Sequence, residues 1–256
     1  MAKDEQSRKW PEQVEAVYVL CHMTKEKARY DRLLPHLLSR GVPADKITIC
    51  APTWGSELKT DTIFTFYDPF LKRGSLPAFT FKSAGLTRGE ISLGINLSVA
   101  IKDIATKAAT KPQQPEKPRL YIILESDVWL REDFVPRLHE ILKEGVNTKW
   151  DYISLGEGVG TRPKVGGDSE LLRSYYGPTK LHVPPHQWVY RCTDSMLFTE
   201  DYMKRLSGTI APFKEIVDWE MNFQLNFVHK GKALWVDPPL VEQGTCFTRI
   251  KTSRPA

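Results

Sequence analysis

Short apolar runs alternate with longer amphipathic stretches along most of the chain. The short runs are rich in Val, Ile, Leu and Tyr, as buried strands are, whereas the longer stretches repeat apolar residues every three or four positions, as helices do. This alternation predicts an α/β fold, with a mostly parallel, Rossmann-like sheet flanked by helices. Strands are expected at residues 14–20, 47–50, 120–124, 195–198 and 233–239 and within 150–160, and helices at 24–41, 86–109, 132–145, 199–208 and 218–231.

Local signals mark the ends of two of these helices. Gly41 stands at the C′ position of the first helix, where glycine commonly ends a helix, and Pro35 inside it is expected to kink or break it. Thr87 and Glu90 have the spacing of a capping box, in which each side chain accepts a hydrogen bond from the other residue's backbone. The long helix should therefore begin just after Thr87.

Two segments lack a regular pattern. Residues 54–85 are irregular and rich in aromatic side chains, with a possible hairpin at 62–70, and residues 110–119 are rich in proline and lysine, as exposed loops are. Neither segment reads as a domain boundary. We expect a single domain over residues 14–250, preceded by a polar extension at 1–13 and followed by a tail at 251–256.

The composition narrows the possible functions. The 256 residues include 36 basic and 31 acidic side chains, a net charge of +5 that suits an anionic ligand such as a nucleoside diphosphate. The basic residues are scattered, so nucleic acid is not an expected partner. No apolar run reaches the ~20 residues of a membrane span, the N-terminus lacks the apolar core of a signal peptide, and the four cysteines show no CxxC spacing. We expect a reducing, cytoplasmic location.

Two acids follow the most apolar of the expected strands. Glu125 and Asp127 stand on either side of Ser126, directly after residues 120–124. Side chains alternate along a strand, so both carboxylates are expected to project to one side, at the carboxyl end of the strand, where α/β sheets bind ligands. Such a pair can hold a divalent cation that neutralises a diphosphate. The alternative is a solvated strand end, or a cap for the helix that follows.

The order of several motifs resembles that of glycosyltransferase family 25, which includes lipooligosaccharide and collagen galactosyltransferases. The family shows an apolar first strand followed by an arginine-containing helix, an L-T-x-G-E-I-G helix start and an apolar run ending in E-D-D. The resemblance extends over about residues 14–245. It is carried by VYVLCHMTKEKARYDRLLPHL, LTRGEISLGINLSVA, YIILESDVW and IVDWEMNFQLN, with Leu86, Thr87, Gly89, Glu90 and Ile91 matching the helix start and Glu125 and Asp127 the acidic motif.

The chain departs from the family pattern at two places. Ser126 stands where the family has the middle acid, and Asn96–Leu97 stand where it usually has Ser-His. The role of that histidine is therefore lost, and the donor specificity of the family is not expected to transfer.

The resemblance implies a GT-A fold that binds a nucleotide-sugar, with a UDP-sugar the favoured donor, together with Mn²⁺ or Mg²⁺. Asp127 would be the main metal ligand, and Glu125 would contact the ribose or support the metal. The end of the first strand, with Leu20 and His22, would border the base. Arg29 or Arg32 would face the nucleotide, although an exposed helix face is the commoner fate of such arginines. Glu90 and Asn96 complete the expected nucleotide site, and the capping box alone also explains Glu90.

The family reaction is inverting and needs a general base for the hydroxyl of a glycan or protein acceptor. Asp218 and Glu220, at the start of the last expected helix, are the candidates for this base, and Asp218 is also a good N-cap. Trp219 could stack on a sugar, but core packing is the commoner use of a tryptophan. The glycine-rich segment 156–169 is expected to be a mobile loop on the acceptor side. The segment 182–188, with His182, His186 and Trp188, is expected to be a loop over the active site. No histidine in LVEQGTCF supplies a third metal ligand.

Two functions from different classes fit these observations. The first is a metal-dependent glycosyltransferase. The second is a catalytically inactive GT-A-like module that binds a glycan or a protein, which the serine in the acidic motif and the missing Ser-His pair would support. Donor hydrolysis or transfer, measured with and without Mn²⁺, discriminates between them.

Overall fold

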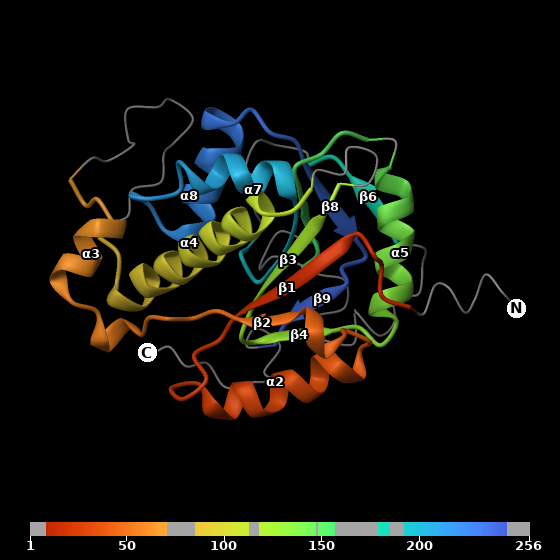
Figure 1. Cartoon of the computed structure of the whole chain (residues 1–256), viewed down its shortest axis with the longest axis horizontal. Helices are drawn as coiled ribbons and strands as arrows, with labels where there is room; N and C mark the ends of the chain where they lie inside the picture. Colours follow the sequence, from red (N-terminus) through yellow and green to blue (C-terminus); the bar gives the residue numbers. More distant parts are fainter. Residues whose placement is uncertain are drawn as a thin grey trace, which may run out of the picture.

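The middle layer of the protein is a mixed β-sheet (Figure 1). The computed structural model describes residues 9–70, 85–112, 118–146, 148–156, 179–184 and 192–244, and within them the sheet has seven strands in the order β2-β1-β3-β7-β5-β8-β6. β1, β2, β3, β5 and β8 run in one direction, and β6 and β7 run in the other. The strands are β1 Val14–Leu20, β2 Ile47–Ile49, β3 Leu120–Glu125, β5 Tyr152–Ser154, β6 Lys180–His182, β7 Ser195–Thr199 and β8 Ala233–Asp237. The predicted α/β fold with a mostly parallel, Rossmann-like sheet is confirmed.

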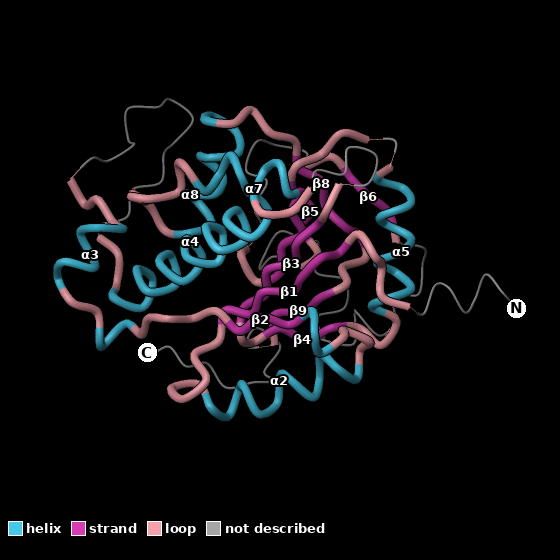
Figure 2. Tube along the Cα trace, viewed as in Figure 1, coloured by secondary structure: helices cyan, strands magenta, loops and turns pink. Residues whose placement is uncertain are grey.

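Helices cover both faces of this sheet (Figure 2). α2 (Lys27–Ser39) and α5 (Phe134–Gly145) pack on one face, and α4 (Arg88–Ala109), α7 (Glu200–Ser207) and α8 (Val217–Phe223) pack on the other. α8 continues as one π-helical stretch, Gln224–Val228, and the short α3 (Thr60–Phe66) lies beside the start of α4. Because side chains alternate along a strand, Val17 and Val19 of β1 face α2, whereas Tyr18 and Leu20 face α4. None of the described helices has the length and apolar character needed to cross a membrane.

β1 and β3 pair in parallel and end at the same edge of the sheet. Val19 is opposite Leu124 and Leu20 is opposite Glu125, so the two strands present their carboxyl ends together. A second, two-stranded sheet lies just beyond this edge and pairs β4 (Val128–Leu130) with β9 (Val241–Gln243). Neither of these three-residue strands was expected from the sequence. They anchor the turn that follows β3.

The helix-end signals behave largely as predicted. Gly41 has a φ of 83°, the left-handed conformation that favours glycine after a helix. Thr87 and Glu90 form the complete capping box, and α4 begins at Arg88, the residue after Thr87. Pro35 does not break α2, which continues through it to Ser39. Trp10, within the expected polar extension, packs its ring against Phe134 and so belongs to the folded domain.

Two local predictions are wrong. Residues 62–70 do not form a hairpin: Thr60–Phe66 is a helix, because Ile63 and Phe66, three positions apart, pack against a cluster that includes Phe213. Asp218 is not an N-cap, since α8 already begins at Val217 and Ile216 occupies the cap position. Val217 is buried in the core between α8 and the sheet, which fixes the start of the helix.

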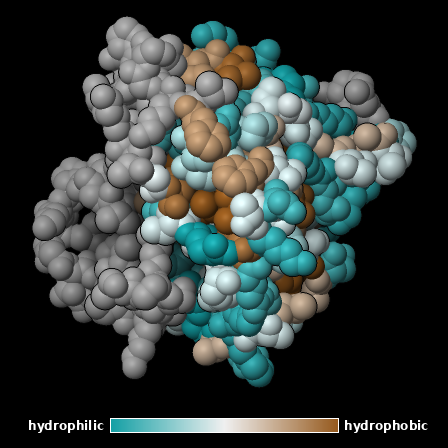
Figure 3. All heavy atoms as spheres, turned by 90° about the vertical axis from the view of Figure 1, so that its left-hand side faces the viewer, coloured by the Kyte–Doolittle hydropathy of each residue, from teal (hydrophilic) through white to brown (hydrophobic). Residues whose placement is uncertain are grey.

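The apolar side chains of α3 also reach the surface. Seen from the side that carries α3, apolar residues gather in the middle of the face with polar residues around them (Figure 3). Phe64 of α3 is 52% exposed, and Phe70, which follows the helix, is 80% exposed. Their rings stack with centroids 6.1 Å apart.

His36 makes the stability of this fold depend on pH. Its Nε2 accepts a hydrogen bond from the backbone N–H of Leu130 (2.8 Å), and its ring packs on Trp129. Burial, helped by the charges of Arg40 and Arg32, lowers the pKa of His36 to about 4. In the unfolded chain the pKa of a histidine is near 6.5, so between about pH 6.5 and 4 the unfolded chain binds a proton at His36 that the folded protein does not. The free energy of unfolding should therefore fall as the pH drops from about 6.5 to 4.

We therefore expect His36→Gln to flatten the pH dependence of the free energy of unfolding within this window, as measured by urea unfolding at several pH values. His139→Gln, on the surface of α5, is the matched control and should keep the wild-type slope. Equal slopes for the wild type and His36→Gln would contradict the prediction.

Candidate functional site

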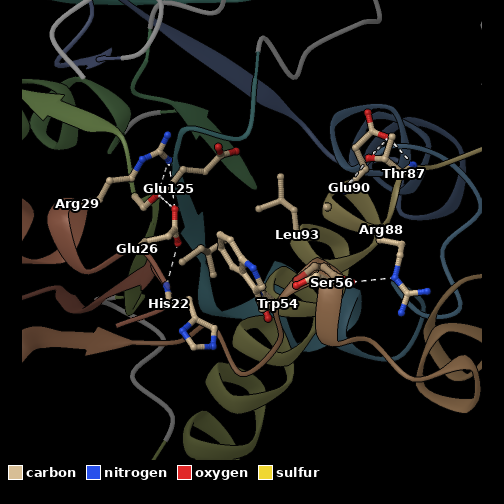
Figure 4. Close-up of a pocket in the computed structure, with 16 residues that line it drawn as sticks. His22, Glu26, Arg29, Trp54, Ser56, Thr87, Arg88, Glu90, Leu93 and Glu125 are labelled. Carbon is tan, nitrogen blue, oxygen red and sulfur yellow. Dashed lines mark hydrogen bonds and ion pairs between the residues drawn. The ribbon is translucent and has the colours of Figure 1, made fainter. Parts of the chain in front are cut away.

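A pocket of about 710 Å³ opens where β1 and β3 end (Figure 4). Its walls come from the end of β1, the start of α2, the loop after β2, the first turns of α4 and the end of β3. This volume is in the range of small-molecule sites, and the position is the one at which open α/β sheets bind their ligands.

The pocket brings together most of the residues predicted for the nucleotide site. Six of them line it, and they come from segments far apart in the sequence: Leu20, His22, Arg29, Glu90, Asn96 and Glu125. The other four predicted residues are not part of the described lining: Arg32, Asp127, Asp218 and Glu220. The nucleotide-side predictions therefore converge on one cavity, whereas the main metal ligand and the two candidate bases lie elsewhere.

Glu125 is the carboxylate that the sheet presents to this pocket. It is the last residue of β3, and its backbone N–H donates to the carbonyl of Asp194 on the neighbouring chain segment (2.8 Å). The Thr193 hydroxyl donates to Oε1 of Glu125 (2.6 Å). These two bonds fix the strand end and one carboxylate oxygen, while the side chain stays partly exposed at the cavity wall.

Asp127 is buried and is not among the residues that line the pocket. The expectation that one strand carries both carboxylates is wrong, because β3 ends at Glu125 and Asp127 belongs to the turn before β4. Asp127 is 5% exposed, and its carbonyl accepts from the N–H of Gly244 (2.7 Å). Burial, together with the nearby charge of Asp127, raises the pKa of Asp194 to about 7. Asp127 thus belongs to a buried polar cluster rather than to the cavity surface.

Arg32 supports the same turn from α2. Its guanidinium donates to the carbonyls of Ser126 (3.1 Å) and Val128 (3.2 Å) and lies over the ring of Trp129. Burial lowers the pKa of Arg32, and the charge of Asp127 opposes that shift. Arg32 therefore holds the backbone of the turn and does not reach the pocket lining.

Sequence reasoning missed Glu26, which completes the acidic wall (Figure 4). Glu26 stands just before α2, and its Oε1 accepts from the Ser126 hydroxyl (2.7 Å) and from Arg29 (3.3 Å), while its Oε2 accepts from the N–H of His22 (2.9 Å). Arg29 also donates to the Ser126 hydroxyl (2.8 Å). Ser126 is thus the centre of a junction between β3 and α2.

The pocket offers few protein ligands to a divalent cation. Within the described residues, no group of three or more His, Cys, Asp and Glu side chains could enclose a metal ion. Mg²⁺ and similar ions, however, are commonly held by one or two carboxylates together with substrate phosphates and water. Glu125 fits that kind of open site, whereas Asp127 is buried and does not line the cavity.

The first turns of α4 form the opposite wall and hold the loop after β2. The side-chain oxygen of Asn96 accepts from the N–H of Thr53 (3.0 Å), and its amide donates to the carbonyl of Thr53 (3.1 Å). The Thr53 hydroxyl also bonds to Ser92 and Asn96, and Arg88 donates to the carbonyls of Gly55 (3.0 Å) and Leu58. Asn96 therefore acts on the protein itself as well as lining the cavity. Glu90 is engaged in the capping box.

Gly55 is needed where this loop meets α4. A Cβ at Gly55 would lie 2.9 Å from the backbone nitrogen of Gly89 and 3.0 Å from the carbonyl of Arg88. Both contacts are too short, and backbone atoms cannot move away without distorting the helix. We expect Gly55→Ala to lower the free energy of unfolding by about 1–3 kcal/mol, the usual range for overpacking, as measured by urea unfolding.

Gly89→Ala is the matched control at the same junction, because the nearest atom to its Cβ is 3.9 Å away. It should be neutral or slightly stabilising, since alanine favours helices over glycine. Equal losses in the two variants would contradict the close approach of the loop to α4.

The two candidate bases lie on α8, outside the described pocket lining. Glu220 is 1% exposed, and its carboxylate accepts from the N–H of Lys214 (3.0 Å) and the amide of Gln224 (2.8 Å). These bonds give Glu220 a structural role. Asp218 is half-buried and accepts from the N–H of Trp219 (3.0 Å). Its assignment as the base stays a prediction.

Several predictions fall partly or wholly outside the described residues. The glycine-rich loop lies there from residue 157 onward, as do His186 and Trp188, whereas His182 belongs to β6. Of residues 240–247, in which no histidine offers a third metal ligand, residues 240–244 are described and the rest lies outside.

Comparison with known proteins adds no family to this picture. No family model matches the chain, and no curated protein matches it significantly.

Proposed function

We propose that this protein is a glycosyltransferase that moves a sugar from a nucleotide-sugar donor, a UDP-sugar first of all, to a hydroxyl of a glycan or a protein. The observation that carries the proposal is the convergence of six residues, predicted from the resemblance to glycosyltransferase family 25, on one pocket at the carboxyl ends of β1 and β3. The sheet order and the two reversed strands are compatible with the GT-A fold that the resemblance implies.

The charges of the pocket suit the donor. As the sugar departs, negative charge develops on the nucleoside diphosphate, and a cation must stabilise it. Mn²⁺ or Mg²⁺ would supply that stabilisation, held by Glu125 together with phosphate oxygens and water. Arg29 lines the same wall and faces the cavity beside Glu125 (Figure 4), where its guanidinium can approach the phosphates.

The assignment of Glu125 rather than Asp127 as the metal-binding carboxylate revises the expectation from the sequence. A buried carboxylate within a cluster that includes Arg32 and Asp194 can orient the turn, but it is not at the cavity surface. The inverting reaction also needs a base for the acceptor hydroxyl. Asp218 is the better of the two candidates, because both carboxylate oxygens of Glu220 accept hydrogen bonds within the fold.

A binding module without transferase activity is the second candidate. It is favoured by the withdrawal of Asp127, which leaves the acidic motif with Glu125 as its carboxylate at the cavity, and by the engagement of Ser126 with Glu26 and Arg29. Such a module would still bind a nucleotide or a sugar in the same pocket.

The test is the release of UDP from UDP-galactose, UDP-glucose and UDP-N-acetylglucosamine, with Mn²⁺ and with a chelator. Metal-dependent release from at least one donor is the expected result. A protein that binds UDP but releases none from any donor, with or without a glycan acceptor, would favour the binding module. Failure to bind any nucleotide would overturn the transferase, and failure to bind sugars as well would overturn the binding module.

A further inference from the structure

An aromatic ring stands in the middle of the pocket wall. Trp54 lies in the loop after β2, lines the cavity and contacts the edge of His22, with ring centroids 5.8 Å apart and planes at 75°. In Figure 4 the indole lies between the group of Arg29, Glu26 and Glu125 on one side and the start of α4 on the other, with Leu93 across from it. Trp54 is not part of the nucleotide site expected from the sequence.

The loop that carries Trp54 is fastened on both sides of the ring. Thr53 is held by Asn96 and Ser92, and the carbonyl of Gly55 is held by Arg88. The missing side chain of Gly55 lets the loop approach the backbone of α4 closely. A tryptophan on such a loop is preorganised, so little conformational entropy is lost when a ligand packs on it.

The surroundings of the ring distinguish it from the charged end of the pocket. Leu20 and Leu93 line the cavity together with Trp54 and provide apolar surface. Glu125 and Arg29 mark the end at which a cation and phosphates would bind. If a ligand places its phosphates at that end, its apolar, planar part lies against the wall that contains Trp54.

On this basis we propose that Trp54 is the stacking surface for the nucleobase of the donor, and that Asn96 is the positioning residue that holds the loop in the binding conformation. The inference rests on the proposed function in that it takes the ligand to be a nucleotide. Stacking on an indole is tolerant of base identity, so the ring contributes affinity for the base while other contacts select it.

The experiment compares nucleotides with a ligand that has no base. Binding of UDP, GDP, CDP and inorganic pyrophosphate is measured by calorimetry in the presence of Mn²⁺, for the wild type, Trp54→Ala, Trp54→Phe and Asn96→Ala. For the nucleotide that binds most tightly, Trp54→Ala should weaken binding about 5- to 100-fold, the usual worth of one stacked base. Trp54→Phe should lose less, and pyrophosphate binding should stay within twofold of the wild type.

Two further variants sharpen the test. Asn96→Ala should weaken nucleotide binding without changing pyrophosphate binding, because it frees the loop but leaves the charged end intact. Trp150→Ala is the matched control. Trp150 lies just before β5, at the end of the sheet where the parallel strands begin, and it packs against the core on the α2 and α5 face. It should leave both affinities unchanged, and the thermal unfolding of each variant is recorded alongside.

The outcomes separate this inference from the proposed function. Nucleotide binding that is unchanged in Trp54→Ala, or lost in parallel with pyrophosphate binding, would overturn the role of Trp54. Loss of transfer with unchanged nucleotide affinity would also overturn it and assign the ring to the acceptor. Base-dependent binding through Trp54 in a protein that transfers no sugar would support the stacking surface and reject the transferase.

Discussion

Replacing Glu125 with glutamine is expected to lower the rate of the proposed sugar transfer by at least about 100-fold and to leave the fold intact. Removing one group that stabilises developing charge commonly costs about 10²- to 10³-fold in rate. Glutamine removes the negative charge that would hold the cation but keeps a carbonyl oxygen that can accept the bond from the Thr193 hydroxyl. The rate is measured as UDP release at saturating donor, over a range of Mn²⁺ concentrations.

The loss should be accompanied by a weaker dependence on Mn²⁺, because the variant lacks the carboxylate to which metal binding is assigned, while Glu26 is engaged by Ser126, Arg29 and His22. Glu132→Gln, an exposed substitution of the same type before α5, is the matched control and should behave like the wild type.

Asp127→Asn separates the two acids of the motif. Asp127 is buried and lies near Arg32 and Asp194, so its substitution should change the stability of the turn more than the response to Mn²⁺. If Asp127→Asn abolished the Mn²⁺ response while Glu125→Gln kept it, the assignment of the metal-binding carboxylate would have to be reversed.

The sequence was sufficient where a signal is local and strong. The seven residues of β1 are mostly apolar and rich in valine, as buried strands are, and the Thr87–Glu90 spacing predicts the capping-box hydrogen bonds that form. The strands β4 and β9 have three residues each, too few for a period to appear, and they form because they pair with each other far along the chain. Such elements exist only in the tertiary structure.

The misread segment at residues 62–70 shows how two periods can compete. Its alternation of threonine with aromatic and branched residues is typical of a strand. Ile63, Phe66 and Tyr67 are also spaced as on one face of a helix, and this spacing is the one that packs against the cluster at the start of α4. Tertiary packing therefore decided between two readings that the sequence allowed.

The candidate site was predictable to the extent that strand ends determine it. Leu20 and Glu125 were both expected at the nucleotide site from the resemblance, and they meet because the parallel neighbouring strands β1 and β3 end at one edge of the sheet. Glu26 and Trp54 were not expected, because their place in the pocket depends on contacts with Ser126 and with α4. The burial of Asp127 depends likewise on a turn that pairing alone creates.

Replacing Arg29 with methionine is expected to lower the free energy of unfolding by about 2–4 kcal/mol, since removing one partner of a buried pair leaves an uncompensated charge. The side chains of Arg29 and Glu26 are 13% and 9% exposed, and both bond to the Ser126 hydroxyl. Methionine preserves much of the length of the side chain and removes the charge. The measurement is urea unfolding at pH 7.

Lys27→Met is the matched control on the same helix, because Lys27 pairs with Asp31 at 2.8 Å with both side chains more than half exposed. An exposed pair of this kind contributes about 1 kcal/mol at most, so its loss should be small. The double variant Arg29→Met/Glu26→Gln should recover part of the loss of Arg29→Met, because it leaves no unpaired charge at the junction. Equal losses in Arg29→Met and Lys27→Met would mean that the Arg29–Glu26 pair at Ser126 contributes little to holding β3 to α2, and that the bonds of Arg32 to the turn carry this contact instead.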